Sequence, residues 1–152
     1  EHFDLVKRTL EKAESIGKRI HLPIDHVIAR EFSNDSPSEV CGVDIPDGFM
    51  GMDIGPETAA EFMSVIENAK TTLWNGPMGV FEMSNFKKGT FEIADGMARN
   101  PRVTVVGGGD SAAAVNLMNK AKDISHVSTG GGASLEFLEG RSLPGIEALS
   151  EK

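Results

Sequence analysis

The stretch VVGGGDSAAAV, from Val105 to Val115, decides the fold class of this chain. Its β-branched residues predict the end of a buried strand, and the alanines after Asp110 predict a helix. Three consecutive glycines separate the two, although glycine loses more backbone entropy on folding than any other residue. A second triple glycine, Gly130 to Gly132, stands in HVSTGGGASLEFLEG between another short strand and another helix. The chain therefore uses the order strand, glycine turn, helix in two neighbouring units.

The same alternation runs along most of the sequence. Helical spacing of apolar residues predicts helices over residues 3–16 (closed by Gly17), 57–70, 86–100, 110–122 and 132–139. Short apolar stretches predict strands over residues 19–29, 71–74, 102–106 and 126–128. Because these strands are apolar and do not alternate with polar residues, they indicate a parallel sheet with helices on both faces. The predicted fold class is thus α/β, a Rossmann-like arrangement of three layers.

The remaining segments predict loops and turns. Residues 30–40 are polar, contain a proline and predict a surface loop. The stretch IPDGFMGMDIGP contains two turn signals, at residues 46–48 and 55–56, and Pro56 suits the first position of the helix that follows. The tail from Arg141 onward is predicted to be irregular.

Composition excludes several classes of protein. The 152 residues are 39% hydrophobic, which is enough for a core, and no apolar run approaches the length of a membrane span. The formal net charge of -8 argues against a nucleic-acid partner. The single Cys41 cannot form a disulfide within the chain and fits a reducing cytoplasm. The four histidines have no metal-ligand spacing, and none is assigned a chemical role.

The two glycine turns predict an anion site. A helix N-terminus carries unpaired backbone N–H groups and about half a positive charge, so it binds phosphate readily. Glycines just before it let the main chain approach a ligand closely. A single such turn is also explained by the needs of a tight strand–helix connection. Two of them at neighbouring strand ends favour a phosphate cradle, since ligands bind at the carboxyl ends of parallel strands.

Asp110 and Ser111 stand at the start of the first of these helices. Asp110 could simply cap the helix. A carboxylate beside a polyphosphate would repel it, however, unless a divalent cation such as Mg²⁺ bridges the two. Ser111 could donate its hydroxyl and its backbone N–H to phosphate, or be an ordinary first-turn residue. The dinucleotide fingerprint is incomplete, because the next strand ends in Ser128 and Thr129 rather than in an acid, and the P-loop pattern is absent.

A third glycine-rich segment, LWNGPMGVFE, follows the strand at 71–74. Asn75 could reach a ribose or phosphate, Glu82 could accept hydrogen bonds from ribose hydroxyls, and Val80 could flank a base. Each also has a structural explanation, since Asn-Gly-Pro is typical of turns and Glu82 could be solvated. Trp74 is predicted to belong to the core.

Together these motifs closely resemble the phosphoglycerate kinase family. The resemblance is carried by LWNGPMGVFE, VVGGGDSAAA, HVSTGGGASLEFLEG, LPIDHVIA, IPDGFMGMDIGPET and FKKGTFEIA, and it covers essentially the whole chain. It implies glycolytic phosphoryl transfer between 1,3-bisphosphoglycerate and MgADP, giving 3-phosphoglycerate and MgATP. It implies that residues 1–152 are the later part of a C-terminal nucleotide-binding domain, in a two-domain protein that is a monomer when intact.

The resemblance also implies a role for each residue that matches the motifs of the family. Gly51, Met52 and Val80 would line the adenine pocket, Glu82 would bind the ribose, and Asn75 would lie near ribose and phosphate. Met52 commonly appears as Leu in the family, which is an easy apolar exchange.

For the phosphates, the resemblance implies a phosphate and magnesium turn made of Gly108, Gly109, Asp110 and Ser111, with Asp110 as the metal contact. Most family members have Thr where Ser111 stands, so a hydroxyl and an N–H are retained. The backbone N–H groups of Gly130, Gly131 and Gly132 would face the transferring phosphoryl group. Gly109 and Gly131 are the predicted catalytic glycines.

Too few cations accompany this cradle for a complete kinase site. No basic residue lies in either glycine turn, and Arg102, Lys120 and Lys122 are predicted at the opposite edge of the sheet. Lys87 and Lys88 are predicted to be a solvated surface pair. Phosphoryl transfer depends on charge stabilisation, and the chain begins with Glu1 rather than Met. We therefore expect a partial protein that lacks the N-terminal phosphoglycerate-binding segment and is inactive alone. A stand-alone nucleotide-binding module and a folded remnant without ligand are the alternatives.

Overall fold

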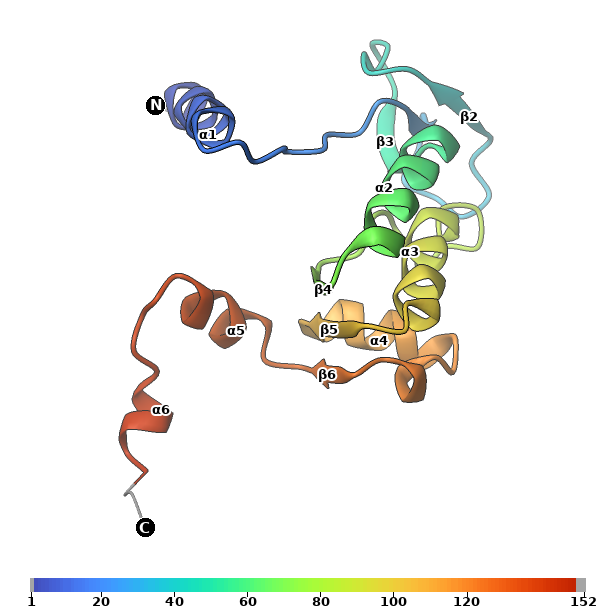
Figure 1. The fold of residues 1–152 in the computed structure, drawn as a ribbon. Helices are drawn as coiled ribbons and strands as arrows, with labels where there is room; N and C mark the ends of the chain where they lie inside the picture. The colour runs from blue at the N-terminus through green and yellow to red at the C-terminus, as the bar shows by residue number, and fades with distance from the viewer. Residues whose placement is uncertain (1, 150–152) are drawn as a thin grey trace.

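The structure is a computed structural model that describes residues 2–149 (Figure 1). Its helices are α1 (His2–Ser15), α2 (Pro56–Asn68), α3 (Lys88–Arg99), α4 (Gly109–Leu117), α5 (Gly131–Leu138) and α6 (Pro144–Glu147), with a 3-10 turn η1 (Ala121–Asp123). Its strands are β1 (His26–Ala29), β2 (Ser38–Cys41), β3 (Met50–Ile54), β4 (Thr71–Asn75), β5 (Val103–Gly107) and β6 (His126–Ser128).

The last three strands form a parallel sheet in the order β4-β5-β6. This sheet, flanked by helices, confirms the predicted α/β fold. The register pairs Asn75 with Gly107 and Gly107 with Ser128. The carboxyl ends of all three strands therefore lie at one edge of the sheet, and each strand ends where a predicted site segment begins.

The first three strands form a separate antiparallel sheet in the order β2-β1-β3. This corrects the prediction from the sequence, in which the strands belong to a parallel sheet. The strand predicted over residues 19–29 is shorter and spans His26–Ala29, and the loop predicted over residues 30–40 ends in β2. β2 escaped prediction because it is a largely exposed strand at the edge of its sheet, without an apolar pattern. β3 lies between the two predicted turns, the first of which has Gly48 at φ +81°.

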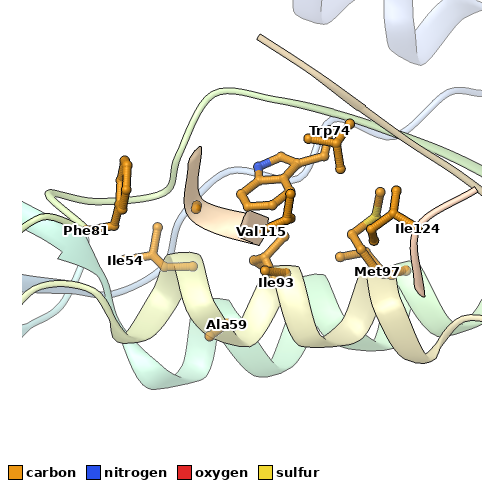
Figure 2. Packing of buried hydrophobic residues seen from close by; sticks show 12 residues of the cluster. Ile54, Ala59, Trp74, Phe81, Ile93, Met97, Val115 and Ile124 are labelled. Carbon is orange, nitrogen blue, oxygen red and sulfur yellow. The ribbon is translucent and has the colours of Figure 1, made fainter. Parts of the chain in front are cut away.

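Buried side chains from both sheets and from α2, α3 and α4 form the main core. Its members are Ile54, Ala59, Ile66, Trp74, Phe81, Ile93, Ala94, Met97, Val106, Ala114, Val115 and Ile124. Figure 2 shows Ile93 of α3 pointing toward Val115 and Trp74, and Met97 of the same helix lying beside Ile124. Trp74 is thus a core residue, as predicted. This packing holds α3 and α4 against the sheet and so fixes the start of α4 at the strand ends.

The boundaries of the helices agree with the predictions to within a few residues, with two differences. α4 ends at Leu117 rather than near Lys122, and the remaining residues form the separate turn η1. The tail predicted to be irregular contains the short helix α6. Gly17 follows α1 at φ +63°, which is the left-handed conformation expected of a glycine that closes a helix.

The predicted apolar stripe of α1 is exposed: Phe3, Val6 and Leu10 have exposed fractions of 90%, 56% and 40%. Figure 1 shows α1 standing apart from both sheets. Among residues 2–149, no helix is both long enough and apolar enough to cross a bilayer.

Candidate functional site

The two glycine turns meet at the carboxyl edge of the parallel sheet. β5 and β6 are neighbours, so the turn after Gly107 lies beside the turn after Ser128. The backbone N–H of Gly108 donates to the carbonyl of Ser128 over 3.0 Å. The helices α4 and α5 begin directly after these turns, at Gly109 and Gly131. Two helix N-termini are thus brought together, as the cradle hypothesis requires.

The contact between the turns depends on two glycines. A Cβ on Gly131 would lie 2.7 Å from the Cα and 3.0 Å from the nitrogen of Gly108, which no side chain tolerates. Gly108 itself has φ +98°, in the region that favours glycine. The main chains therefore approach each other at a distance that only glycine permits.

The other two glycines of the predicted phosphate site face open space. A Cβ built on Gly109 or on Gly132 meets no atom within 4 Å outside its chain neighbours and its own helix. Both residues are exposed. Local packing therefore gives no reason for a glycine at either position, and the space beside them is available to a ligand.

Backbone N–H groups suitable for an anion are present at both helix starts. The first intrahelical bonds are made by the N–H of Ala112 to Gly108 in α4 and by the N–H of Ser134 to Gly130 in α5. The three N–H groups before each of these, at residues 109–111 and 131–133, have no acceptor within their own helix. They include the groups predicted at Gly109, Asp110, Ser111, Gly131 and Gly132, and Ala133 in addition. The N–H groups of Gly108 and Gly130, which were also predicted for phosphate, instead donate to the carbonyl and the hydroxyl of Ser128 over 3.0 and 3.1 Å.

Asn75 and Ser111 connect these turns to the segment after β4. The Asn75 Oδ1 lies 2.9 Å from the Cβ position of Gly108 and 3.4 Å from that of Gly131. The Ser111 hydroxyl is buried and accepts a hydrogen bond from the backbone N–H of Gly76 over 2.7 Å. Its position is therefore explained by the fold, and its role toward phosphate stays a prediction. Trp74 Nε1 donates to the carbonyl of Gly76 and fixes the same turn.

Asp110, the predicted magnesium contact, lies at the start of α4 beside the first glycine turn, and its metal role stays a prediction. Its side chain is exposed in the first turn of α4, where a carboxylate also interacts favourably with the helix dipole. Among residues 2–149, no group of three or more His, Cys, Asp or Glu side chains could hold a metal ion. Asp110 would consequently share the ion with phosphate oxygens and water.

The predicted base and ribose residues lie around β3. The N–H of Val80 donates to the carbonyl of Met52 over 2.9 Å, which joins the segment after β4 to the antiparallel sheet. Met52 is only 2% exposed, because its side chain packs in a small cluster with Ala29 and Phe86. Little of it is left to touch a base, whereas Gly51 and Glu82 are exposed.

Sequence reasoning missed two buried polar residues that position this region. Asp53, in β3, accepts hydrogen bonds from the N–H of Gly89 over 2.7 Å and of Ile54 over 2.9 Å. The Thr90 hydroxyl accepts from the N–H groups of Met78 and Gly79 over 3.0 and 3.2 Å. The signal for Asp53 was a charged residue inside the otherwise apolar stretch MGMDI.

The nearest lysines in the sequence are engaged elsewhere. Lys88 pairs with Glu92 over 3.7 Å, Lys87 lies over the ring of Phe91, and Lys120 pairs with Asp95 over 3.1 Å. Lys87 is half-buried, whereas the sequence predicted that it is solvated. In the described part of the chain, these three lysines therefore interact with side chains outside the glycine turns.

Comparisons with known proteins agree on one family. The family model described as phosphoglycerate kinase matches residues 1–141. The chain is 54% identical over 152 residues to phosphoglycerate kinase of Levilactobacillus brevis and 56% identical over 150 residues to that of Lactobacillus delbrueckii subsp. lactis. These alignments include 99% and 98% of the chain, and 37% and 36% of the two relatives.

Solved structures give the same result. The structure of phosphoglycerate kinase from Coxiella burnetii superposes with a TM-score of 0.88 at 39% identity, over 95% of this chain and 38% of that one. The enzyme from Pyrococcus horikoshii gives a TM-score of 0.76 at 32% identity, over 97% and 36% of the two chains. The chain thus spans little more than a third of the length of the relatives it matches.

Proposed function

The chain belongs to the phosphoglycerate kinase family, and from this premise we propose that its residues form part of the nucleotide site of such a kinase. The whole enzyme would transfer a phosphoryl group between 1,3-bisphosphoglycerate and MgADP, giving 3-phosphoglycerate and MgATP. The observation that supports this most is the direct contact between the two glycine turns, which gathers the N–H groups of two helix starts at one place.

In this proposal the N–H groups at residues 109–111 and 131–133 bind phosphate oxygens. They are already oriented by α4 and α5, so they stabilise developing negative charge without reorganisation during the reaction. Gly109 and Gly132 leave room for the phosphates, and Asn75 lies beside Gly108 and Gly131 near the phosphates and ribose. Glu82 accepts from the ribose hydroxyls, and Val80 packs against the base with Gly51. The side chain of Met52 is buried in the cluster on which Val80 packs, so it supports this pocket without touching the base.

Asp110 would hold Mg²⁺ together with the phosphate oxygens of ADP or ATP. When bound, Mg²⁺ would neutralise part of the negative charge of the polyphosphate. The remaining requirement, basic groups around the transferred phosphoryl group, would be met by chain outside these residues, including a segment that binds the phosphoglycerate. We therefore propose that residues 1–152 alone have no kinase activity.

A chimera tests this function. The part of the Levilactobacillus brevis enzyme that precedes the matched region is joined to this chain, and both the chimera and the 152-residue chain are assayed in a coupled reaction. We expect turnover for the chimera only. A folded chimera without activity would contradict the kinase function, and activity of the chain alone within a few orders of magnitude of the chimera would contradict its dependence on other segments.

Thermal unfolding of the same two proteins separates the alternatives. A protein that binds MgADP is stabilised in proportion to the logarithm of ligand concentration above Kd. Stabilisation of the 152-residue chain by MgADP would favour an autonomous nucleotide-binding module. Stabilisation of the chimera alone would agree with a site that needs both parts.

A further inference from the structure

A single buried carboxylate joins both ends of the loop that carries Val80 and Glu82. Asp53 is 4% exposed in β3, next to Met52. Its Oδ2 accepts from the N–H of Gly89, in the first turn of α3, over 2.7 Å. Gly89 closes the segment that begins at Gly79, and we call this segment loop 79–89. Asp53 is thereby tied to the end of the loop.

The beginning of the loop packs against the same carboxylate. A Cβ on Gly79 would lie 2.3 Å from the Asp53 Oδ1, and a Cβ on Gly89 would lie 2.4 Å from it. Only glycine allows both chain segments to approach the carboxylate this closely. The loop therefore leaves and returns to one buried side chain, and the residues between its ends include the predicted base and ribose contacts.

Neighbouring interactions keep the loop in register with β3. The N–H of Val80 bonds to the Met52 carbonyl, and Phe86, which is fully buried, packs on the Met52 side chain. Asp53 follows Met52 directly, so the same strand holds the adenine-pocket position and the anchor of the loop. Displacing Asp53 would shift Val80 and Glu82 relative to Gly51 and Met52, while the two glycine turns are held by a different set of bonds.

We propose that Asp53 is a positioning residue for recognition of the adenine and ribose, and that it has no part in binding the phosphates. This inference rests on the proposed nucleotide site. It divides the site in two: the base and ribose depend on the buried carboxylate, and the phosphates depend on the contact between Gly108 and Gly131.

Asp25 provides a matched control. It is also buried, at 5% exposed, and its carboxylate accepts from the N–H groups of Glu57 and Thr58 over 2.9 and 2.8 Å at the start of α2. A Cβ on Gly55 would lie 2.1 Å from its Cγ. Asp25 thus has the same kind of glycine-lined, helix-starting environment, but it touches neither loop 79–89 nor the glycine turns.

The experiment compares Asp53→Asn with Asp25→Asn in the chimera, using adenosine and magnesium pyrophosphate as separate competitive inhibitors. Asparagine has the shape of aspartate but places an N–H₂ group against one of the two N–H donors. Loss of one hydrogen bond to a charged group predicts that Asp53→Asn raises the Ki of adenosine and the KM of MgADP by about tenfold or more. We expect kcat and the Ki of pyrophosphate to stay within about twofold, because the phosphate contacts are unchanged. Asp25→Asn should leave both inhibition constants unchanged.

The pH dependence of adenosine binding provides a second measurement, which can be made on the unmodified chimera. Burial, and to a lesser extent the Glu92 carboxylate, raise the pKa of Asp53 to about 6, although the hydrogen bonds from Gly89 and Ile54 lower it. The other ionisable groups around the same small cavity are Glu39 of β2 and Lys88 of α3. The Ki of adenosine, which does not titrate near this pH, should rise in the unmodified chimera as the pH falls through about 6, and that transition should be absent in Asp53→Asn.

Several outcomes would overturn the inference. It fails if adenosine and pyrophosphate weaken together in Asp53→Asn, if neither changes, or if Asp25→Asn behaves in the same way. Should Asp53→Asn not fold, a flat pH profile for adenosine in the unmodified chimera would contradict it, and a transition near pH 6 would support it. If the unmodified chimera binds none of these ligands, the proposed function itself fails and this inference fails with it.

Discussion

The two glycine turns look alike in sequence but differ in what holds them. The first turn has Gly108 at φ +98°. It is stabilised by the hydrogen bond from the N–H of Gly76 to the hydroxyl of Ser111. The second has no glycine with positive φ between Gly130 and Gly132, and Gly131 lies directly against the first turn. The first turn therefore needs glycine for its backbone conformation, and the second needs glycine because the first turn lies so close to it.

This comparison separates glycines that the fold requires from glycines that it does not. Gly108 and Gly131 are required by backbone conformation and by close approach. Gly109 and Gly132 stand in open space at helix starts, where alanine would fit. If the open positions are glycines for the sake of a ligand, substitutions at the two kinds of site should separate stability from binding.

The largest loss of stability is expected for Gly131→Ala. Its methyl group would overlap the backbone of Gly108, which cannot move without disturbing β5 and α4. Overpacking of this kind costs about 1–3 kcal/mol, and we expect the upper end because the obstacle is main chain. Chemical denaturation measures the change in the free energy of unfolding. A loss below about 0.5 kcal/mol, within the usual range for surface substitutions, would show that the turns are not in contact.

A smaller loss is expected for Gly108→Ala. A residue other than glycine at φ +98° and ψ 147° costs about 1–3 kcal/mol. The new Cβ would also press on the Oδ1 of Asn75, which can rotate away. The same denaturation experiment applies, with Gly76→Ala as a control, because Gly76 has φ +100° and no atom within 4 Å of its Cβ position. Equal losses would assign the effect to backbone conformation alone, whereas a greater loss at Gly108 would show that Asn75 contributes.

Ser111→Ala should cost about 1 kcal/mol, because it leaves the N–H of Gly76 without its acceptor. Ser111→Thr retains the hydroxyl and is the matched control. Denaturation and MgADP affinity are both measured. If the alanine variant has full stability, the hydroxyl is not needed to brace the first turn.

The smallest change in stability, and the clearest change in binding, is expected for Gly109→Ala and Gly132→Ala. Alanine favours a helix over glycine by up to about 1 kcal/mol, so both variants should be as stable as the unmodified chain or slightly more stable. Their methyl groups would occupy the space assigned to phosphate, so the KM of MgADP in the chimera should rise. Unchanged KM and kcat in both variants would remove these positions from the site.

Sequence reasoning predicted the parallel half of the fold and missed most of the antiparallel half. β4, β5 and β6 are short apolar stretches bounded by glycine turns and helices, so each has a local signal. β2 is exposed at an edge, and β3 lies between two turns, so their pairing with β1 depends on contacts between distant residues. The spacing of apolar residues predicted α1. It could not show that, within the described residues 2–149, no other element covers the apolar stripe of this helix.

For the candidate site, sequence motifs identified the glycine turns, and the parallel register explains why these turns meet. Sequence could not separate Gly109 from Gly108, because the difference lies in φ and in the distance to Asn75. It also could not identify Asp53, whose partners Gly79 and Gly89 are brought to it only by the fold. The Ser111 hydroxyl shows the same limit, since its bond to Gly76 joins two segments that are separate in the sequence.

The most direct test of one shared anion site is a titration of the chimera with MgADP, followed by NMR with glycine labelled by ¹⁵N. We expect the amide signals of Gly109, Gly131 and Gly132 to shift along a single saturation curve, and magnesium pyrophosphate to reproduce these shifts. Signals from only one turn moving, or the two turns saturating at different concentrations, would contradict the claim that the two helix starts hold one magnesium-bound polyphosphate.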